Sequence, residues 1–340
     1  MTAVSYISAT DPLGHTAPLE YRAMFPLLGV PLEVRSNSPA VLAAAERSFG
    51  GWHNLERELV DASEPCVVSL VVHGDITRTG AIYCASPTGE ARRPFAFRMH
   101  GDCFLAGDGP NLLMAQRDRG MALGFVTPEL AADEPWLRHH ALELLALLLV
   151  SRRDRLPVHA GALVRNGRAI LLTGPSMAGK STLCYAGVRA GFGLLAEDVV
   201  YVSRANGMRL WGVPWQIHLL ADARERFPEL ANLPVTQLPN GKHKLAVETA
   251  QLGADRPRRY VERALVCLVE RGAGYESAIE PIDPAIAVAA FTSDLEVGFD
   301  FYDGTREVAE ALAAGGAYRL IVGSDVDRAV ALLKELTDNG

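Results

Sequence analysis

The sequence predicts two domains: a smaller α+β domain over residues 1–152, and an α/β domain with a mixed sheet over residues 153–340. Three observations predict this division. A polar break, SRRDRLP, lies at 151–157. The strand-like and helix-like segments after this break alternate differently from the segments before it. A Gly-rich turn ending in Lys-Ser-Thr at 174–182 joins an apolar strand-like segment to a helix-like one, as in a phosphate-binding loop (P-loop).

Length and composition narrow the classes of protein. With 340 residues the chain can bury two cores. A net charge of -7 leaves no basic field for nucleic acid, and no apolar run approaches the roughly 18 residues of a membrane span. The five cysteines lack CxxC spacing, and the start of the chain lacks a secretory pattern. We expect a cytoplasmic protein that binds neither nucleic acid nor membrane; whether it forms a homo-oligomer is left open.

The first domain is expected to mix helices and strands. Helical spacing between a Ser start and a Gly-Gly stop predicts a helix over 38–52. Segments 65–75 and 94–109 are rich in branched and aromatic residues and close on Gly-Asp turns, which predicts strands. The apolar segment 135–150 predicts a second helix before the break.

In the second domain an Asn-Gly pair separates the segments 156–164 and 169–174, and this pair is a strong hairpin signal. We expect a single strand over 156–164, paired with the strand that leads into the Gly-rich turn. Residues 180–191 should form a helix that ends in glycine, and 192–202 a buried strand.

Two later segments complete the predicted domain. Residues 263–271, RALVCLVER, should form a strand. Residues 317–336 should form a strand and then a helix, with a Gly-Ser-Asp cap between them.

The Gly-rich turn satisfies G-x-x-x-x-G-K-[ST] in full. Its glycines let successive N–H groups turn toward phosphate oxygens, and the following helix adds the positive end of its dipole. Lys180 would reach the β- and γ-phosphates, and the Ser181 hydroxyl would bind Mg²⁺. The predicted nucleotide-binding residues are Gly174, Pro175, Ser176, Met177, Ala178, Gly179, Lys180, Ser181 and Thr182.

An acidic pair, Glu197-Asp198, interrupts an apolar segment seventeen residues past Lys180. Two buried carboxylates need a partner, and beside a P-loop that partner is usually the metal or its water shell. The alternative is a pair that caps a turn at the exposed end of a strand.

The order of His159, the Asn-Gly turn, the P-loop and LLAED resembles the catalytic domain of HPr kinase/phosphorylase, whose fold is related to that of phosphoenolpyruvate carboxykinase. The resemblance covers residues 159–201 and extends more loosely to the carboxyl end. It is nearest to HPr-kinase-like proteins of peptide natural-product pathways, including kinases of lasso-peptide precursors. ATP and Mg²⁺ are the cofactors that it implies.

The resemblance also implies residue roles. His159 would orient the catalytic carboxylate. The first carboxylate of the pair, Glu197, would be the general base, and Asp198 would support the metal together with Ser181. Because the family usually has Asp-Asp and this chain has Glu-Asp, the division of roles between the two stays open.

One region departs from the family. The signature segment that regulatory HPr kinases carry after the nucleotide domain is missing, which argues against HPr as substrate and against phosphorolysis. PNGKHKL stands there instead. Lys242 and Lys244 would close over the phosphates as a phosphate or substrate loop; the alternative is a solvated basic loop.

These observations favour an ATP- and Mg²⁺-dependent kinase that phosphorylates a hydroxyl, with a serine of a peptide or protein as the expected acceptor. The first domain would serve recognition or assembly. A small-molecule kinase and a nucleotide-binding regulator with little catalysis are the alternatives. A transporter ATPase is disfavoured, because the chain has no LSGGQ segment.

Overall fold

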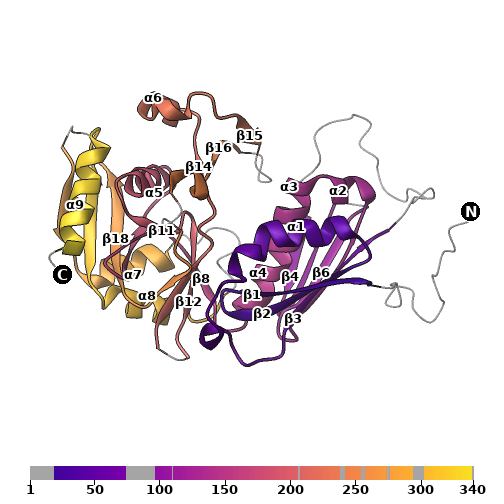
Figure 1. Cartoon of the computed structure of the whole chain (residues 1–340). Helices are drawn as coiled ribbons and strands as arrows, with labels where there is room; N and C mark the ends of the chain where they lie inside the picture. Colours follow the sequence, from indigo (N-terminus) through magenta and orange to yellow (C-terminus); the bar gives the residue numbers. More distant parts are fainter. Residues whose placement is uncertain are drawn as a thin grey trace, which may run out of the picture. The chain divides into compact units, whose positions relative to one another are not determined.

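The computed structural model describes residues 19–73, 96–108, 110–205, 207–237, 242–253, 257–272, 274, 276–293 and 302–338. The chain divides into two compact units, Met1–Arg153 and Asp154–Gly340 (Figure 1). Parts of several predicted segments lie outside the described residues: the ends of the two predicted strands at 74–75 and 94–95, and residues 239–241 of PNGKHKL.

The described strands of the first unit form a seven-stranded sheet in the order β1-β2-β3-β7-β6-β5-β4. They are β1 (Tyr21–Leu27), β2 (Val30–Ser36), β3 (Cys66–Val72), β4 (Ala96–His100), β5 (Cys103–Gly107), β6 (Leu112–Gln116) and β7 (Met121–Val126). Strand β3 runs parallel to both of its neighbours, and the other pairs are antiparallel. The two predicted strand segments correspond to β3 and to the β4–β5 hairpin.

Helices cover one face of this sheet. They are α1 (Pro39–Phe49), η1 (Gly50–Trp52), η2 (Arg57–Leu59), α2 (Pro128–Ala132), α3 (Glu134–Trp136), η3 (Leu137–Glu143) and α4 (Leu144–Ser151). Both predicted helices are confirmed: α1 and η1 account for 38–52, and the run from α3 to α4 accounts for 135–150. The segment η3 within that run is π-helical.

The second unit is built on a six-stranded sheet in the order β11-β9-β10-β18-β20-β19. Its strands are β9 (Gly161–Arg165), β10 (Arg168–Thr173), β11 (Gly193–Ala196), β18 (Ala264–Arg271), β19 (Ala278–Pro281) and β20 (Ala317–Val322). Strands β10, β18 and β20 are parallel, whereas β9, β11 and β19 run antiparallel to their neighbours. The predicted mixed sheet is therefore confirmed.

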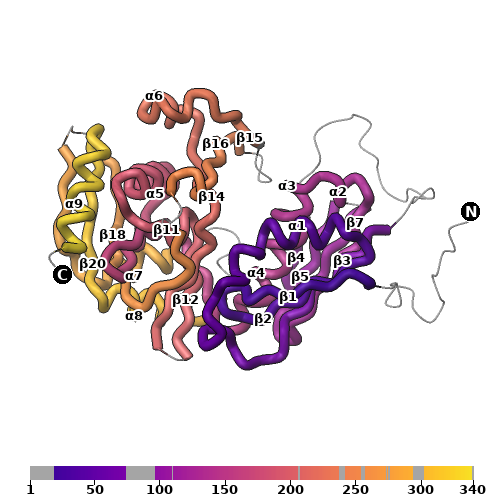
Figure 2. Tube along the Cα trace, viewed as in Figure 1, coloured from indigo at the N-terminus to yellow at the C-terminus, as the bar shows by residue number. Residues whose placement is uncertain are grey.

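Two smaller sheets complete the described part of this unit. One, in the order β17-β13-β12-β8, contains β8 (Leu156–His159), β12 (Val199–Ser203), β13 (Arg209–Gly212) and β17 (Tyr260–Val261). The other, in the order β14-β16-β15, contains β14 (Gln216–Leu219), β15 (Val235–Gln237) and β16 (His243–Glu248), and we call it the arm sheet. Figure 2 shows β14 beside helix α5 (Lys180–Arg189), with which it is in contact.

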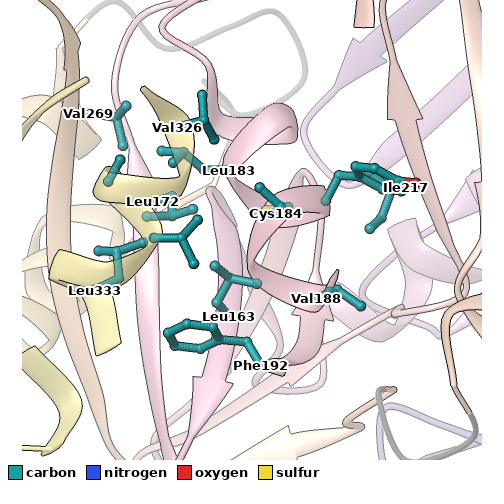
Figure 3. Close-up of a cluster of buried hydrophobic side chains, with 14 of the residues drawn as sticks. Leu163, Leu172, Leu183, Cys184, Val188, Phe192, Ile217, Val269, Val326 and Leu333 are labelled. Carbon is teal, nitrogen blue, oxygen red and sulfur yellow. The ribbon is translucent and has the colours of Figure 1, made fainter. Parts of the chain in front are cut away.

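Apolar clusters cover both faces of the six-stranded sheet. Leu172 of β10 belongs to a buried cluster that also contains residues of α5, the arm sheet and α9 (Val326–Asp338). In Figure 3 it lies between Leu333 of α9 and Leu183 of α5. On the other face, Leu171 packs with β12, α7 (Pro284–Thr292) and α8 (Thr305–Ala313). The sheet is thus packed on both faces, and the loops at its carboxyl edge extend from buried strands.

The prediction of one strand over 156–164 is wrong. The chain forms two strands, and β8 pairs with β12 whereas β9 pairs with β10. The crossover takes place at Ala160, whose N–H donates to the Asp198 carbonyl at 2.9 Å. Gly161 allows it, since a Cβ there would lie 3.0 Å from the Glu197 carbonyl oxygen. His159 therefore does not lie on a strand that pairs with the one feeding the P-loop.

The predicted strand over 192–202 is also divided in two. Strands β11 and β12 belong to different sheets, and Glu197 and Asp198 are the residues between them. Successive side chains of an extended chain point to opposite sides, and here the two neighbouring carboxylates do so at the junction of two sheets.

Candidate functional site

The P-loop lies between β10 and α5. Gly174 has φ +138°, and a Cβ at this position would lie 2.5 Å from the Val269 carbonyl oxygen of β18. Gly179, the residue before the helix, has φ +104°, and Met177 at the tip is also left-handed, with φ +66°. These turns wrap the loop around the amino end of α5, where free N–H groups and the helix dipole favour an anion.

Lys180 folds back over the loop. Its side chain is buried, and the ammonium donates to the carbonyl of Gly174 at 2.7 Å and to that of Pro175 at 3.2 Å. The positive charge is therefore held against the carbonyls at the start of the loop. A polyphosphate in the loop would meet this ammonium directly.

Glu197 is the buried member of the acidic pair, with 8% of its surface exposed. Its Oε1 accepts a short hydrogen bond from the Ser181 hydroxyl, and its Oε2 lies 3.4 Å from Nδ1 of His218. Burial by itself raises the pKa of Glu197, but the hydrogen bonds from His218 and Ser181 and the charge of Lys244 outweigh burial and hold the pKa below its ordinary value. Glu197 is thus a fixed carboxylate beside the metal-ligating position of the loop.

Asp198 is the exposed member, with 61% of its side chain accessible. Its Oδ1 lies 3.5 Å from Nδ1 of His159, whose own side chain is 23% exposed. The crossover at Ala160 brings this histidine to the acidic pair, because β8 and β12 pair His159 with Val199. A second molecule can approach the Asp198 carboxylate, whereas Glu197 is closed off.

The two lysines predicted for a phosphate or substrate loop lie at and near the start of β16. Lys244 is partly buried within the strand, and its charge helps to lower the pKa of Glu197. Lys242 is exposed just before the strand. Residues 239–241, which precede Lys242 in this segment, lie outside the described part of the chain.

Sequence reasoning did not place His218 among the site residues. The core residues of this strand are in fact its neighbours, Ile217 and Leu219, which are buried in the cluster around α5. Alternation places His218 on the opposite face. That alternation was the available signal, but the meeting of β14 with Glu197 depends on tertiary contacts that the pattern does not contain.

A cavity of about 390 Å³ lies on the other side of the P-loop from the acidic pair. Gly179 and Thr182 line it from the loop and helix, and Arg271 and Ser324 line it from the ends of β18 and β20. Arg226 of helix α6 (Ala223–Arg226) closes it, donating to the Ser324 carbonyl at 2.8 Å. The order β11-β9-β10-β18-β20 separates the two sides, with the acidic pair beyond β9 and the cavity over β18 and β20.

The donor set beside the loop fits a magnesium ion. Within the described residues no cluster of three His, Cys, Asp or Glu side chains could hold a metal alone. A nucleotide-bound Mg²⁺ does not need one, because it typically takes one or two protein groups, phosphate oxygens and waters. The Ser181 hydroxyl and the ionised Glu197 carboxylate supply such groups.

Comparison with known proteins gives distant similarities. No family model matches the sequence. The chain is similar to the zinc import ATP-binding protein ZnuC of Paracoccus denitrificans (strain Pd 1222), with 27% identity over 223 residues that cover 54% of this chain and 86% of that protein. Among solved structures it is similar to the HPr(Ser) kinase/phosphatase from Coxiella burnetii, with a TM-score of 0.31, 15% identity, and coverage of 54% of this chain and 88% of that one.

Neither similarity assigns the chain to a family. The sequence motif and the loop geometry make the second unit a P-loop domain within a mixed α/β fold. Among the described helices, none has the length and apolar character needed to cross a membrane.

Proposed function

We propose that this chain is an ATP- and Mg²⁺-dependent kinase that transfers the γ-phosphoryl group to a hydroxyl, with a serine of a peptide or protein as the acceptor. The observation that supports transfer is the exposed Asp198 carboxylate beside His159, adjacent to the P-loop and distinct from the buried Glu197. A protein that only binds nucleotide needs no accessible carboxylate with an orienting histidine.

The geometry supports roles for the acidic pair that are the reverse of those that the family resemblance implies. Glu197 contacts Ser181, so we assign it to the metal side. Asp198 is accessible and next to His159, so we assign it as the general base. An accessible carboxylate within hydrogen-bond reach of an incoming hydroxyl can accept its proton.

The position of the nucleotide follows from the cavity on one side of the P-loop and the acidic pair on the other. The cavity lined by Thr182, Arg271 and Ser324 would take the nucleoside, and the loop would hold the phosphates. The γ-phosphate then points toward the acidic pair. The similarity to an ATP-binding protein supports ATP as the nucleotide.

In the transfer itself, Asp198 accepts the proton of the acceptor hydroxyl while the acceptor oxygen forms its bond to the γ-phosphorus. The bond between that phosphorus and the bridging oxygen breaks, and ADP leaves with the electron pair. Bound Mg²⁺ would neutralise charge on the phosphates. Lys180 offsets the charge on the transferred group, and Lys244 is placed to contribute.

The decisive test is transfer of label from radiolabelled ATP by the purified full-length chain to peptide and metabolite fractions, read as phosphorylated product. Lys180→Ala should abolish transfer. Asp198→Asn should lower kcat by about 10²- to 10⁴-fold, with the KM for ATP little changed. Glu262→Gln is the matched control, since Glu262 is an equally exposed carboxylate with a cationic partner, Arg209.

Three outcomes would contradict the proposal or one of its parts. ATP binding with no phosphorylated product from any fraction would exclude a kinase and leave a regulator, or an ATPase of the kind to which the transporter subunit belongs. If Asp198→Asn kept full transfer and Glu197→Gln lost it, Glu197 would be the base. A product found only in the metabolite fractions would identify a small-molecule kinase.

A further inference from the structure

The arm sheet has an apolar face and a polar face. Ile217, Leu219, Leu245 and Val247 alternate along β14 and β16 and are all buried in the cluster around α5. The residues between them therefore lie on the other face of the two strands. His218 pairs with Ala246 across the strands, and Lys244 is two residues from Ala246 on the same face. Burial of the apolar face in the cluster around α5 thus fixes the position of the polar face beside the P-loop.

On this face His218 meets the buried carboxylate. Its Nδ1 lies 3.4 Å from Oε2 of Glu197, while Ser181 donates to Oε1. The imidazole is 21% exposed and the Glu197 side chain 7%, so the contact is largely shielded from water. Two elements far apart in the chain, α5 and β14, therefore hold the two oxygens of one carboxylate.

We propose that His218 is a positioning residue for Glu197: its Nδ1–H holds Oε2 and thereby keeps Oε1 turned toward Ser181 and the magnesium position. This inference rests on the proposed function, because it assigns Glu197 to the metal side of a nucleotide site. His218 itself contacts neither phosphate nor acceptor in this role.

The physical reason lies in the terminal rotation of a glutamate side chain. The torsion that turns the carboxylate has a broad, roughly two-fold preference, so burial alone does not fix the orientation of the two oxygens. A hydrogen-bond donor to each oxygen fixes this orientation. Removal of His218 would leave a buried oxygen without this donor and would free the rotation. Outer partners of this kind typically change metal affinity or activity by roughly 10- to 100-fold.

The test compares His218→Ala and His218→Asn in the full-length chain. An asparagine amide nitrogen can occupy nearly the place of imidazole Nδ1, so His218→Asn keeps a donor toward Oε2. The first readout is Mn²⁺ affinity in the complex with a non-hydrolysable ATP analogue, followed by electron paramagnetic resonance. The second is the affinity for the same analogue in the presence of a chelator.

We expect His218→Ala to weaken Mn²⁺ binding by roughly 10- to 100-fold, and His218→Asn to recover most of this loss. Affinity for the metal-free nucleotide should stay within about twofold of the wild type in both variants, since the loop is unchanged. His243→Ala is the matched control, because this exposed histidine lies on β16 of the same sheet and should change neither quantity.

An unchanged Mn²⁺ affinity in His218→Ala would overturn the proposal. A parallel loss of metal-free nucleotide binding, not recovered in His218→Asn, would also overturn it, because it would reveal a packing role. The readouts need no turnover. If the wild type binds Mn²⁺ and nucleotide but transfers no phosphate, and His218→Ala still loses Mn²⁺ affinity, the kinase proposal fails while the positioning role stands. A wild type that binds no Mn²⁺ with nucleotide would overturn both.

Discussion

Neighbouring residues of the same chemical type have different environments in this protein. Glu197 is buried and hydrogen-bonded on both oxygens, whereas Asp198 is largely exposed beside His159. Both residues lie in the link between β11 of one sheet and β12 of another, and successive side chains of an extended chain point to opposite sides. Pairs of acids whose environments differ in this way are suited to separate roles in one reaction.

His140 of the first unit is a histidine whose pKa is strongly changed by its surroundings. It stacks on Trp136 with ring centroids 3.8 Å apart. Burial, followed by the charge of His139, lowers the pKa of His140 to about 4. The unfolded chain therefore takes up this proton first as the pH falls from about 6.5, and folding becomes less favourable until the pH has passed through about 4.

We predict that His140→Phe, which keeps an aromatic ring against Trp136, flattens this part of the pH dependence. The wild type should lose roughly 2 kcal/mol more than the variant between pH 6.5 and 4, after allowance for the partial exposure of the ring. Urea denaturation at several pH values measures the difference. The same slope in both proteins would show that burial of His140 does not disfavour its charged form.

At the scale of elements, close backbone approaches hold the two sheets beside the site. Gly212 of β13 faces β11, and a Cβ at position 212 would lie 1.8 Å from the Leu195 carbonyl oxygen. Because that neighbour is backbone, it cannot turn away, and one of the two strands would have to shift. Glu197 follows β11 directly, so such a shift would reach the site.

We predict that Gly212→Ala lowers the free energy of unfolding by about 3 kcal/mol. Gly167→Ala is the control: nothing lies within 4 Å of its added Cβ, but its φ of +72° makes alanine strained. That strain should cost only about 1 to 2 kcal/mol. Chemical denaturation of both variants gives the comparison, and equal losses would mean that the close approach is relieved by small movements.

The elements also show what the sequence could predict. The P-loop, α5 and the strand β18 were predictable, because each depends on a local motif or a local apolar pattern. The breaks at Ala160 and at Glu197-Asp198 were not. Apolar residues continue through the first break, and at the second the acidic pair indicated a metal partner or a turn at a strand end but not a change of sheet. His218 was missed for a related reason: its partner Glu197 is twenty-one residues away along the chain.

At the scale of the whole molecule, the candidate site belongs to one unit. The P-loop, the acidic pair, His159 and the arm sheet all lie within Asp154–Gly340. The first unit has a buried core of its own between its sheet and its helices. A recognition or assembly role for the first unit, expected from the sequence, stays a proposal.

We predict that an ATP analogue with Mg²⁺ protects the second unit selectively against amide hydrogen exchange. At a hundredfold excess over Kd, bound ligand adds about 2.7 kcal/mol to the free energy of opening, so peptides of β10 and α5 should exchange up to roughly 100-fold more slowly. Peptides of the first unit should exchange as before. Lys180→Ala should show no protection, and protection that persists in this variant would place the ligand elsewhere.

The crossovers that divide β8 from β9 and β11 from β12 have a consequence for how this protein can change. The two crossovers are in register with each other: the Ala160 N–H donates to the carbonyl of Asp198, and His159 pairs with Val199. The number of residues between each crossover and its neighbouring strands is therefore fixed. Inserting or deleting one residue between a crossover and its strand would reverse every side chain beyond it. Substitutions can therefore diversify the site, but libraries for a new acceptor should keep the residue spacing at the two crossovers, 156–161 and 193–199.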